Sequence, residues 1–479
     1  MATPSILLGP IVGGLSHNSA NIWARADASS TLHVWLATRA DTKDAKHAGE
    51  TDLFSNDGFA GIVPLTKLKP ETRYYYAVSL RKTKPARTKF HNFTTFPKPS
   101  ARHSFSFVFG SCYLPNGENE SQTFEEIYKH ISLDQLRFGL FVGDQIYADD
   151  ARRNGLGKIA VTLEDYRSVY AHAWSRPSVH KLLPSLPAFM ILDDHEVDND
   201  WRFNDLERNS PYIPFHVRLL RQITGAPAEQ CSLSMERVRA ALKAYQEHQA
   251  IHAPNMLMPI QADAQGRFLF QRGDEGTFAY TFAFGSAAFF VLDTRTRRVK
   301  KERNILLGEA QWQQLEEWLL SVKDKYPVKF LISSGTIMYP FWLDVAGDRW
   351  AGFRPERERL FKFLAENEIE GVHILAGDLH SAHCVSAEIK CPSGRRIPIW
   401  EFCSSPFEQA TNVISFTYFP IISKWIRNQK KLFRQRGHNF GIVHVDFDGP
   451  TPRVTFTLHY NDGGWKTRPA IITSNSSNS

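Results

Sequence analysis

Cysteine is scarce in this chain of 479 residues, which contains five cysteines, an odd number. So few and so scattered thiols exclude the disulfide framework of a small secreted domain and are compatible with a reducing compartment. No segment approaches the roughly 20 uninterrupted apolar residues that a membrane-spanning helix needs. The start of the chain has no basic stretch, and Gly9 and Pro10 interrupt its apolar run, unlike a secretory signal. From these absences we expect a cytoplasmic protein.

A large excess of one charge is also absent. The 57 basic and 50 acidic side chains give a net charge of +7 and a pI near 9.0, a weak preference for phosphorylated or polyanionic partners. Hydrophobic residues make up 42% and charged residues 22%, which excludes a largely disordered chain. At this length we expect two to three domains. Low complexity is confined to the Ser- and Asn-rich end, and we expect residues 466–479 to form a disordered tail.

Short alternating runs of aromatic and β-branched residues fill the first 95 residues. Residues 20–25, 32–37 and 74–80 are examples, and turn residues separate them. The pattern predicts a small β-sandwich. Residues 65–76 resemble the loop-to-strand corner of fibronectin type III modules, with a generic hairpin corner as the alternative. The Pro-rich, basic residues 96–102 indicate a linker, and we therefore expect an N-terminal fibronectin- or immunoglobulin-like domain over residues 1–98.

Beyond the linker, apolar strands alternate with amphipathic helices, as is typical of an α/β domain. We expect this domain to cover residues 99–465, with a mainly helical stretch over 161–261. The predicted strands are residues 105–112, 138–142, 287–292, 329–335 and 371–376, and the predicted helices are residues 122–136, 308–322 and 354–366.

Several of these strands stop abruptly at polar residues. Residues 138–150 read Phe-Gly-Leu-Phe-Val-Gly-Asp-Gln-Ile-Tyr-Ala-Asp-Asp, and residues 191–200 read Ile-Leu-Asp-Asp-His-Glu-Val-Asp-Asn-Asp. Such clusters are either Asp-rich surface turns or metal sites. Adjacent parallel strands bring their ends together at one sheet edge, where ligands can converge. The candidates that lie just after apolar runs are Cys112, Asp144, Tyr147, Asp194, Asp378 and His380.

The residue types at these strand ends suit a two-metal hydrolase. Such a centre needs a carboxylate that bridges two cations, terminal ligands on each, and an activated water. Asp144 and Tyr147 are three residues apart, so that one strand-to-loop turn can aim both inward. Phenolate and thiolate are strongly donating anions that suit ferric iron, whereas carboxylates suit calcium, magnesium or manganese. The mixture predicts two unlike metals.

Five motifs occur in a fixed order along the chain. They are Gly110-Ser-Cys112, Gly143-Asp-Gln-Ile-Tyr147, Asp193-Asp-His-Glu196, Leu292-Asp-Thr-Arg295 and Gly377-Asp-Leu-His380. The second is similar to the Gly-Asp-x-x-Tyr motif of purple acid phosphatases in the calcineurin-like metallophosphoesterase superfamily. Together, over most of residues 5–460, they resemble PhoD-type alkaline phosphatases. The resemblance implies an α/β metallophosphoesterase fold, a two-sheet β core flanked by helices, preceded by a fibronectin type III-like β-sandwich.

The resemblance also implies roles for individual residues. His195 would stabilise charge on the phosphate or protonate the leaving oxygen without binding metal. Fe³⁺ and Ca²⁺ are the implied cofactors, with Mn²⁺, Mg²⁺ or Zn²⁺ as alternatives. The usual opening Asp-x-His is absent, and Asp378 and His380 replace the usual Gly-His-x-His ending. The implied ligands are Asp144 as the bridge, Tyr147 and Cys112 for iron, Asp194 in a position usually occupied by Asn, and Asp378 with His380 to complete the shell.

Two arginines are candidates for holding phosphate oxygens through bidentate hydrogen bonds. We assign Arg295 a catalytic role and Arg167 a substrate-binding role, with a structural salt bridge as the alternative for each. The other polar residues of the two acidic loops are expected to be solvated, with outer-shell or calcium contacts as the alternative. These are Asp149, Asp150, Asp198, Asn199 and Asp200.

The expected activity is hydrolysis of phosphoric esters, as in an alkaline phosphatase or phosphodiesterase, with a metal-held hydroxide attacking phosphorus in line. One competing interpretation is a zinc site at His380, His383, Cys384, Cys391 and Cys403, whose spacings lack paired Cys-x-x-Cys knuckles. Another is a non-catalytic protein that binds phosphate, lipid or nucleic acid through a basic helix at residues 424–436. We expect a phosphate-ester substrate and no obligate protein partner. Peripheral contact with an anionic membrane is a further hypothesis, and nucleic acid is not expected.

Overall fold

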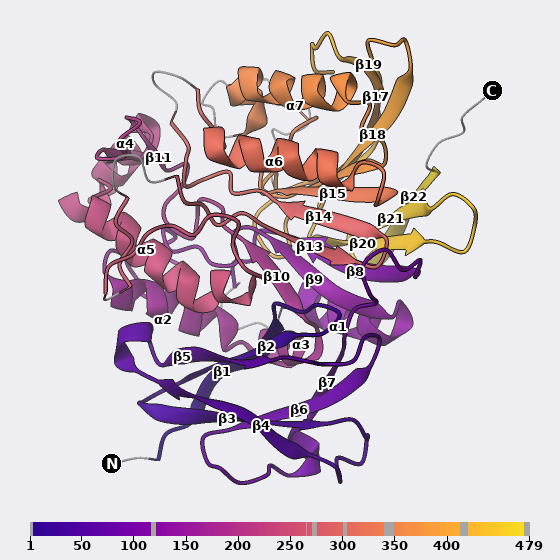
Figure 1. Cartoon of the computed structure of the whole chain (residues 1–479). Coiled ribbons are helices and arrows are strands. Elements are labelled where there is room, and N and C mark those ends of the chain that lie inside the picture. The colour runs from indigo at the N-terminus through magenta and orange to yellow at the C-terminus, as the bar shows by residue number, and fades with distance from the viewer. Residues whose placement is uncertain are drawn as a thin grey trace.

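The computed structural model describes residues 3–115, 121–264, 266–270, 275–299, 304–339, 349–411 and 420–473. The N-terminal strands form a separate layer at the bottom of Figure 1, and the two larger sheets with their helices are stacked above it. None of the helices in these ranges combines the length and apolar character needed to cross a membrane. All five cysteines lie in the described ranges, and each is free and buried.

The N-terminal layer is a β-sandwich, as the sequence predicts. A three-stranded sheet of order β1-β2-β5 faces a four-stranded sheet of order β4-β3-β6-β7. Ile22, Val34 and Tyr76 are fully buried between them, because alternate residues of each strand point inward. The strands are β1 (Ile6–Gly13), β2 (Ala20–Ala26), β3 (Ser30–Ala37), β4 (Lys46–Leu53), β5 (Ala60–Leu65), β6 (Arg73–Ser79) and β7 (His91–Thr94).

The first of the larger sheets has six strands in the order β10-β9-β8-β20-β21-β22. Strands β8, β9 and β10 are parallel, so their carboxyl ends lie at the same edge. The strands are β8 (Phe105–Gly110), β9 (Leu136–Val142), β10 (Ala188–Ile191), β20 (Asn439–Asp446), β21 (Arg453–Asn461) and β22 (Trp465–Thr473). A separate short pair joins β11 (Arg202–Phe203) to β12 (Pro211–Tyr212).

The second large sheet has seven strands in the order β13-β14-β15-β16-β18-β17-β19. Its central strands β14, β15, β16 and β18 are parallel to one another. The strands are β13 (Tyr280–Phe284), β14 (Ala287–Val291), β15 (Val328–Ser333), β16 (Val372–Ala376), β17 (Ala382–Lys390), β18 (Arg396–Cys403) and β19 (Ile426–Gln435).

Phenylalanine rings join the two large sheets face to face. Phe107 of the first sheet stacks on Phe138 with ring centroids 4.9 Å apart. The same Phe107 ring meets Phe289 and Phe330 of the second sheet edge-on at 5.7 and 5.4 Å. All four rings are buried, and each such pair contributes about 0.5–1.5 kcal/mol beyond its buried area. This packing fixes one sheet against the other, so that the strand ends of both face a common space.

Helices cover the outer faces of this two-sheet core. Figure 1 shows α6 and α7 lying over the seven-stranded sheet, while α1, α2, α3 and α5 lie toward the sandwich. Helix α6 buries Trp312, Leu315 and Leu319 at helical spacing, and the three helices predicted from the sequence are confirmed. The helices are α1 (Gln122–Leu133), α2 (Leu163–Trp174), α3 (Pro177–Leu182), α4 (Phe215–Ile223), α5 (Met235–His248), α6 (Glu309–Val322) and α7 (Arg354–Glu366).

Two predictions near the end of the chain are wrong. The basic segment 424–436 is not a helix, because most of it forms β19, which pairs with β17 at the edge of the seven-stranded sheet. Its Ile426 and Phe433 are buried while Lys430 and Lys431 are exposed, and such charges protect an edge strand from pairing with other chains. Residues 466–473 of the predicted tail instead belong to β22 and pair with β21. The rest of that tail, residues 474–479, lies outside the described residues.

Candidate metal centre

The acidic strand ends meet at one edge of the two-sheet core. Cys112 follows β8, Asp144 and Tyr147 follow β9, and the group from Asp193 to Glu196 follows β10. From the second sheet, Arg295 lies beyond β14, and Asp378 and His380 lie between β16 and β17. Because the sheets face each other, loops more than 260 residues apart in sequence come into contact, as when the Asp378 N–H donates to Ser111 Oγ at 3.1 Å.

Asp144 lies at the centre of this cluster. Its carboxylate belongs to three sets of potential ligand atoms, each set within 4.8 Å: with Cys112 and His380, with Asp194 and His195, and with Asp193, Asp194 and Asp378. The Cys112 thiol donates to Asp144 Oδ2 at 3.3 Å, and Tyr147 Oη lies 3.5 Å from the same oxygen. Tyr147 Oη is also 3.1 Å from His380 Nε2. The structure therefore brings all the predicted ligands together, and Asp144 is the residue common to the three sets.

The backbone at the cluster adopts unusual conformations. Cys112, Asp144, Asp378 and His380 all have positive φ, at 62°, 54°, 64° and 51°. Non-glycine residues pay a conformational penalty there, and such residues concentrate at functional sites. Gly143 has a φ of 87°, and a Cβ at this position would lie 2.5 Å from Asp193 Cβ. Glycine at 143 thus permits the close approach of the β9 and β10 loops.

Glu196 holds those two loops together from within. Its fully buried carboxylate accepts the backbone N–H groups of Asp144 at 3.2 Å and Gln145 at 2.7 Å. It also accepts the Asp193 N–H at 3.0 Å and the Gln249 side-chain amide at 2.9 Å. All four donors are buried, and the Gln249 amide also donates to Tyr170 Oη at 2.9 Å. Glu196 is therefore the structural support of the ligand loops.

Replacing Glu196 with alanine is expected to destabilise the metal-free protein by about 3 kcal/mol or more, because three backbone N–H groups lose a charged acceptor. Urea unfolding followed by tryptophan fluorescence measures the free energy of unfolding. Glu317→Ala on α6 is the matched control, since among the described residues Glu317 accepts only an exposed hydrogen bond from Gln313, and its effect should stay within about 0.5 kcal/mol. Equal effects of the two substitutions would contradict the supporting role.

His195 is oriented by Asp149. The His195 Nδ1 atom lies 2.7 Å from Asp149 Oδ1, and the His195 N–H donates to Asp144 Oδ1 at 3.2 Å. The His195 ring packs on Tyr147, with centroids 4.1 Å apart. Burial alone would lower the pKa of His195, but Asp149 and Asp194 raise it to about 10. Burial would raise the pKa of Asp149, but His195 and Arg221 lower it to about 2. Both shifts favour the charged forms, a carboxylate on Asp149 beside an imidazolium on His195.

The prediction that Asp149 and Asp198 are solvated loop residues is wrong. The Asp149 side chain is 7% exposed and also accepts the Asn199 N–H at 3.1 Å. Asp198 is fully buried, and Arg221 and Arg237 each contact it at 2.6 Å. Asp149 therefore positions His195, and Asp198 anchors the β10 loop to α4 and α5.

Two arginines neutralise part of the carboxylate charge. Arg295 is almost fully buried, its Nε binds Asp193 Oδ1, and its Nη2 lies 3.4 Å from Asp194 Oδ1. Arg349, which the sequence did not single out, binds Asp378 Oδ2 through Nε. Arg295 thus lies at the centre, and its contacts are those of the structural salt bridge, the alternative from sequence, because it binds carboxylates on the β10 loop.

The donor set fits metal ions. Burial and the neighbouring Cys112, Asp194 and Asp193 raise the pKa of Asp144 well above its usual range, so a cation would relieve real repulsion. Burial lowers the pKa of His380 to about 3, which leaves its imidazole neutral and able to bind a metal. Burial, with Asp378, raises the pKa of Cys112 to about 12, so a metal would have to displace the thiol proton.

Arg167 lies outside this group. Its guanidinium makes a bidentate pair with Glu247 of α5, at 2.8 and 2.7 Å, and donates to the Asn56 carbonyl of the sandwich at 2.9 Å. The structural salt bridge, the alternative from sequence, is what the structure contains. A substrate-binding role for Arg167 has no support in these contacts, because all of its partners belong to the junction of α2, α5 and the sandwich.

Arg167→Met is therefore expected to leave kcat/KM unchanged when normalised to folded, metal-loaded protein. The substitution removes the guanidinium from the Glu247 carboxylate, which is 3% exposed. Lys243, at 3.7 Å, still pairs with this carboxylate. We expect a loss of stability of about 3 kcal/mol. Urea unfolding and steady-state kinetics measure the two effects separately, with Arg167→Lys as the conservative control. A large rise in KM without loss of stability would instead assign Arg167 to substrate binding.

The competing zinc site is not assembled among the described residues. His380 joins the Asp144 cluster, whereas His383 Nε2 lies 2.9 Å from Glu401 Oε1. The Cys403 thiol donates a hydrogen bond to the Gly377 carbonyl at 3.4 Å. These thiols pack as small buried side chains in and around the sheet.

Two family models match separate parts of the chain. The family model described as PhoD-like phosphatase matches residues 107–456, and a second model, described as a domain of unknown function (DUF7800), matches residues 3–97. Alkaline phosphatase D of Bacillus subtilis (strain 168) is 24% identical over 349 residues, which cover 66% of this chain and 52% of the relative. The chain thus spans about half the length of this curated relative.

Two solved structures share the fold over 99% of this chain. A structure of PhoD matches with a TM-score of 0.68 at 18% identity and is covered over 93% of its length. The purple acid phosphatase PPD1 from yellow lupin (Lupinus luteus) seeds matches with a TM-score of 0.58 at 13% identity, over 75% of its length. The fold is therefore metallophosphoesterase-like, and because the first family model covers most of the sequence, the chain belongs to the PhoD-like phosphatase family.

Proposed function

We propose that this protein is a metal-dependent hydrolase of phosphoric esters. The observation that carries the proposal is the position of Asp144, whose buried carboxylate belongs to three potential ligand sets at the meeting point of two sheets. A bridging carboxylate in this setting is what a two-metal hydrolase requires. The relative named alkaline phosphatase D supports the same reaction class.

We assign the ligands as two groups that share Asp144. Cys112, Tyr147 and His380 supply a thiolate, a phenolate and an imidazole, a set that suits Fe³⁺. Asp194 and Asp378 supply carboxylate oxygens, which suit Ca²⁺ or another hard divalent ion. Cations held there would supply Lewis-acid polarisation of a phosphoryl group and of a water molecule.

The chain's own contribution to bond cleavage is assigned to the His195–Asp149 dyad. Asp149 fixes the His195 ring through Nδ1, which leaves Nε2 to hold a proton for the departing ester oxygen. The His195 side chain is 16% exposed, so a substrate can reach it from solvent. Arg295 is buried against Asp193 and Asp194, so we propose that it acts by holding the Asp194 carboxylate in place.

We also propose a division of the chain into two domains. Residues 1–98 would form a fibronectin type III-like module, and the hydrolase domain would begin at residue 99. β22 pairs with the rest of the six-stranded sheet, so this domain extends to Thr473 rather than ending at 465. Extensive contacts between the two parts support a fixed arrangement: Trp23 of β2 donates to the Glu247 carbonyl of α5 at 3.0 Å.

The experiment that tests the function is a substrate panel on protein purified without added metal. Phosphate monoesters and diesters are assayed side by side, with metals measured in the same sample before and after chelation. We expect turnover of at least one class, loss of turnover on chelation, and recovery on adding back the metals found. A metal-free, inert protein that stays inert after supplementation with Fe³⁺ and Ca²⁺ would instead support the non-catalytic binding alternative.

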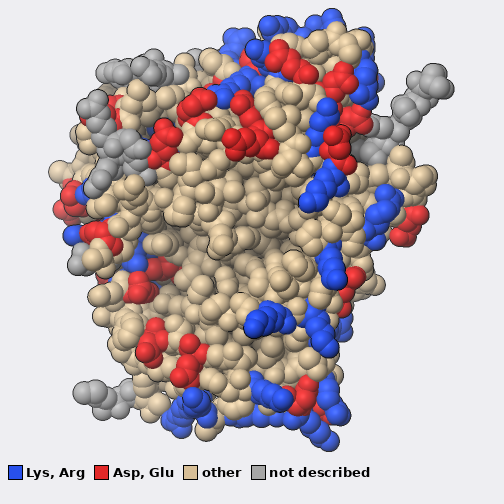
Figure 2. All heavy atoms as spheres, viewed as in Figure 1, with Lys and Arg blue, Asp and Glu red and all other residues tan. Residues whose placement is uncertain are grey.

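Strand β19 is proposed to attract the anionic substrate or an anionic membrane surface. Figure 2 shows Lys and Arg side chains gathered at the top of the molecule, where Figure 1 places β17 and β19. Lys430 and Lys431 are exposed, and Gln435 of β19 pairs with Ala382, which lies two residues after His380. The basic edge thus leads toward the metal centre.

Charge reversal at Lys430 and Lys431 to glutamate is expected to raise KM several-fold at low salt while leaving kcat and metal content unchanged. The difference should disappear above about 0.5 M salt, where the Debye length is a few ångströms. Co-sedimentation with phosphatidylserine vesicles tests the membrane contact. Reversal of the exposed Lys129 and Lys181 provides a control of equal charge. Identical salt dependence and vesicle binding in all three proteins would contradict the proposal.

A further inference from the structure

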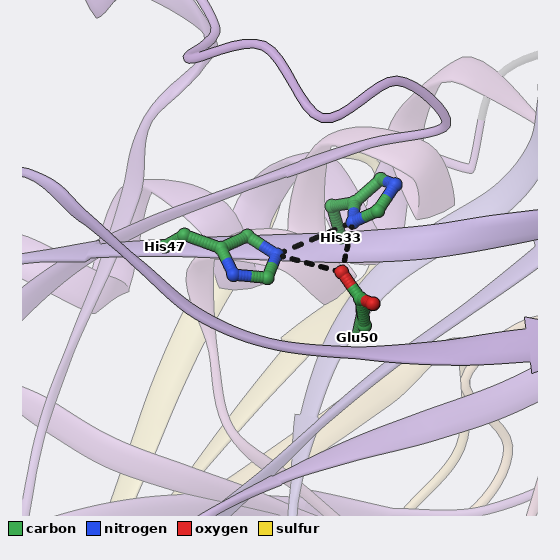
Figure 3. Close-up of side chains that lie close together, drawn as sticks. All are labelled: His33, His47 and Glu50. Atoms are coloured by element: carbon green, nitrogen blue, oxygen red, sulfur yellow. Dashed lines mark hydrogen bonds and ion pairs between the residues drawn. The ribbon is translucent and has the colours of Figure 1, made fainter.

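The N-terminal sandwich carries a second cluster of metal-binding side chains. His33 of β3 and His47 and Glu50 of β4 point toward a common point in Figure 3. His33 Nδ1 lies 3.2 Å from His47 Nε2 and 3.0 Å from Glu50 Oε2, and the third side of the triangle, from His47 Nε2 to Glu50 Oε2, is 3.4 Å. The cluster lies outside the segment that the PhoD-like family model matches and inside the one matched by the domain of unknown function.

A β-bulge places these three side chains on one face of the sheet. His33 is directly opposite Glu50 in the β3–β4 pairing, and Trp35 is opposite His47, with a register shift after Val34. In a regular strand, residues three apart such as His47 and Glu50 would point to opposite faces. The extra residue of the bulge reverses the direction of His47, and bulges often re-aim a side chain in this way.

The triangle has the dimensions of a tetrahedral metal site. With metal–ligand bonds near 2.0–2.1 Å, two ligand atoms of a tetrahedral zinc ion lie about 3.3 Å apart. The three observed separations, 3.2, 3.0 and 3.4 Å, bracket this value. Two imidazoles and one carboxylate are also the donor set of open zinc sites, in which a fourth position is left to water.

We propose that His33, His47 and Glu50 bind a divalent transition-metal ion of the zinc class. The exposed fractions rise across the cluster, from 9% for His33 to 24% for His47 and 44% for Glu50. The buried His33 provides a fixed anchor, and the open side next to Glu50 leaves room for a water ligand and for entry of the ion. A bound ion would join β3 to β4 across the bulge, where the regular backbone pairing is interrupted.

Lys82 is the group that competes with such an ion. Its Nζ lies 3.2 Å from Glu50 Oε2, the same oxygen that faces both imidazoles. The Lys82 side chain is 65% exposed, so it can leave the carboxylate at little structural cost. If the cluster is only an ion-pair network, Lys82 belongs to it. If the cluster is a metal site, Lys82 weakens it.

The test is a zinc titration of the full-length protein with its catalytic metals retained. We expect calorimetry and equilibrium dialysis to show one more zinc ion bound per wild-type chain than per His47→Gln or Glu50→Gln chain. Loss of a ligand should weaken this binding by about 100-fold or more, beyond the range for outer-shell partners. His103→Gln is the control, because His103 also pairs with a carboxylate, Glu71 at 2.7 Å, but with one imidazole only.

Lys82→Met separates the two interpretations by the sign of its effect. A metal site predicts several-fold tighter zinc binding in this variant, because Glu50 is released, and unchanged phosphoester turnover. The proposal is overturned if wild-type protein binds no more zinc than the His47→Gln and Glu50→Gln variants. It is equally overturned if Lys82→Met leaves the zinc affinity unchanged or weakens it. Since His47 and Glu50 are partly exposed, these substitutions test binding without removing the buried His33.

Discussion

Asp144→Asn is expected to remove bound metal and phosphoester turnover together, with kcat/KM falling about 10³-fold or more, because several kcal/mol of transition-state stabilisation depend on the bridged cations. The metal-free variant should be at least as stable as the wild type. The pKa of Asp144 is raised in the folded state by burial and by its anionic neighbours, so ionisation of this group costs the fold stability as pH rises past the usual carboxyl range. Asparagine cannot ionise and avoids that loss.

The measurement combines elemental analysis, steady-state kinetics and thermal unfolding with and without added metal. Wild-type protein should melt at a higher temperature when its metals are present, and Asp144→Asn should lose most of this increase. Asp41→Asn, at a half-buried aspartate of the sandwich that pairs with Arg39, is the control for the charge change. Full metal content and turnover in Asp144→Asn would refute the assignment of the bridge.

His195→Ala is expected to lower kcat by about 10²–10⁴-fold while metal content stays the same, because a positioned proton donor contributes that much. The loss should depend on the leaving group. Alkyl phosphates need a proton on the departing oxygen, whereas nitrophenyl phosphates release a stable anion, so the variant should retain far more of its activity on the second class. Kinetics on a matched pair of such esters measures the difference.

Asp149→Asn provides the companion test for a positioning residue. Asp149 contacts His195 Nδ1 at 2.7 Å, and its loss should give the same leaving-group dependence with a smaller overall effect. Equal losses on both ester classes in His195→Ala would contradict proton donation. A lowered metal content in His195→Ala would instead identify His195 as a metal ligand. Its ring lies close enough for that role, because His195 belongs to one of the sets around Asp144.

The strand ends were predictable because their signal is local. An apolar run that stops at Gly143 and Asp144 indicates a buried strand with its functional group at the carboxyl end, and parallel neighbours converge by geometry. The structure accordingly brings Cys112, Tyr147 and His380 to Asp144. Family resemblance added the roles, which neither spacing nor composition supplies.

The residues that sequence reasoning misplaced depend on distant partners. Asp149 and Asp198 look like solvated loop acids until His195, Arg221 and Arg237 are placed beside them. Arg167 carries no local sign that Glu247, 80 residues later, is its partner. In each case the desolvation cost of burying the charge is offset by an ion pair that only the tertiary fold creates.

Local sequence also fails to predict backbone structure at strand β19 and at the cluster of His33, His47 and Glu50. Residues 424–436 have the composition of a basic helix, and pairing with β17 overrides that local preference. His33, His47 and Glu50 share a face only because of the β4 bulge, which the alternating pattern does not predict. Non-local pairing thus decides both features.

Anomalous diffraction from crystals of the metal-loaded protein shows directly whether Asp144 lies between two cations. We expect two anomalous peaks about 3.5–4 Å apart on either side of the Asp144 carboxylate, with one within bonding distance of Cys112 and Tyr147. Absence of any peak within bonding distance of Asp144, in protein that hydrolyses phosphoric esters, would contradict this expectation.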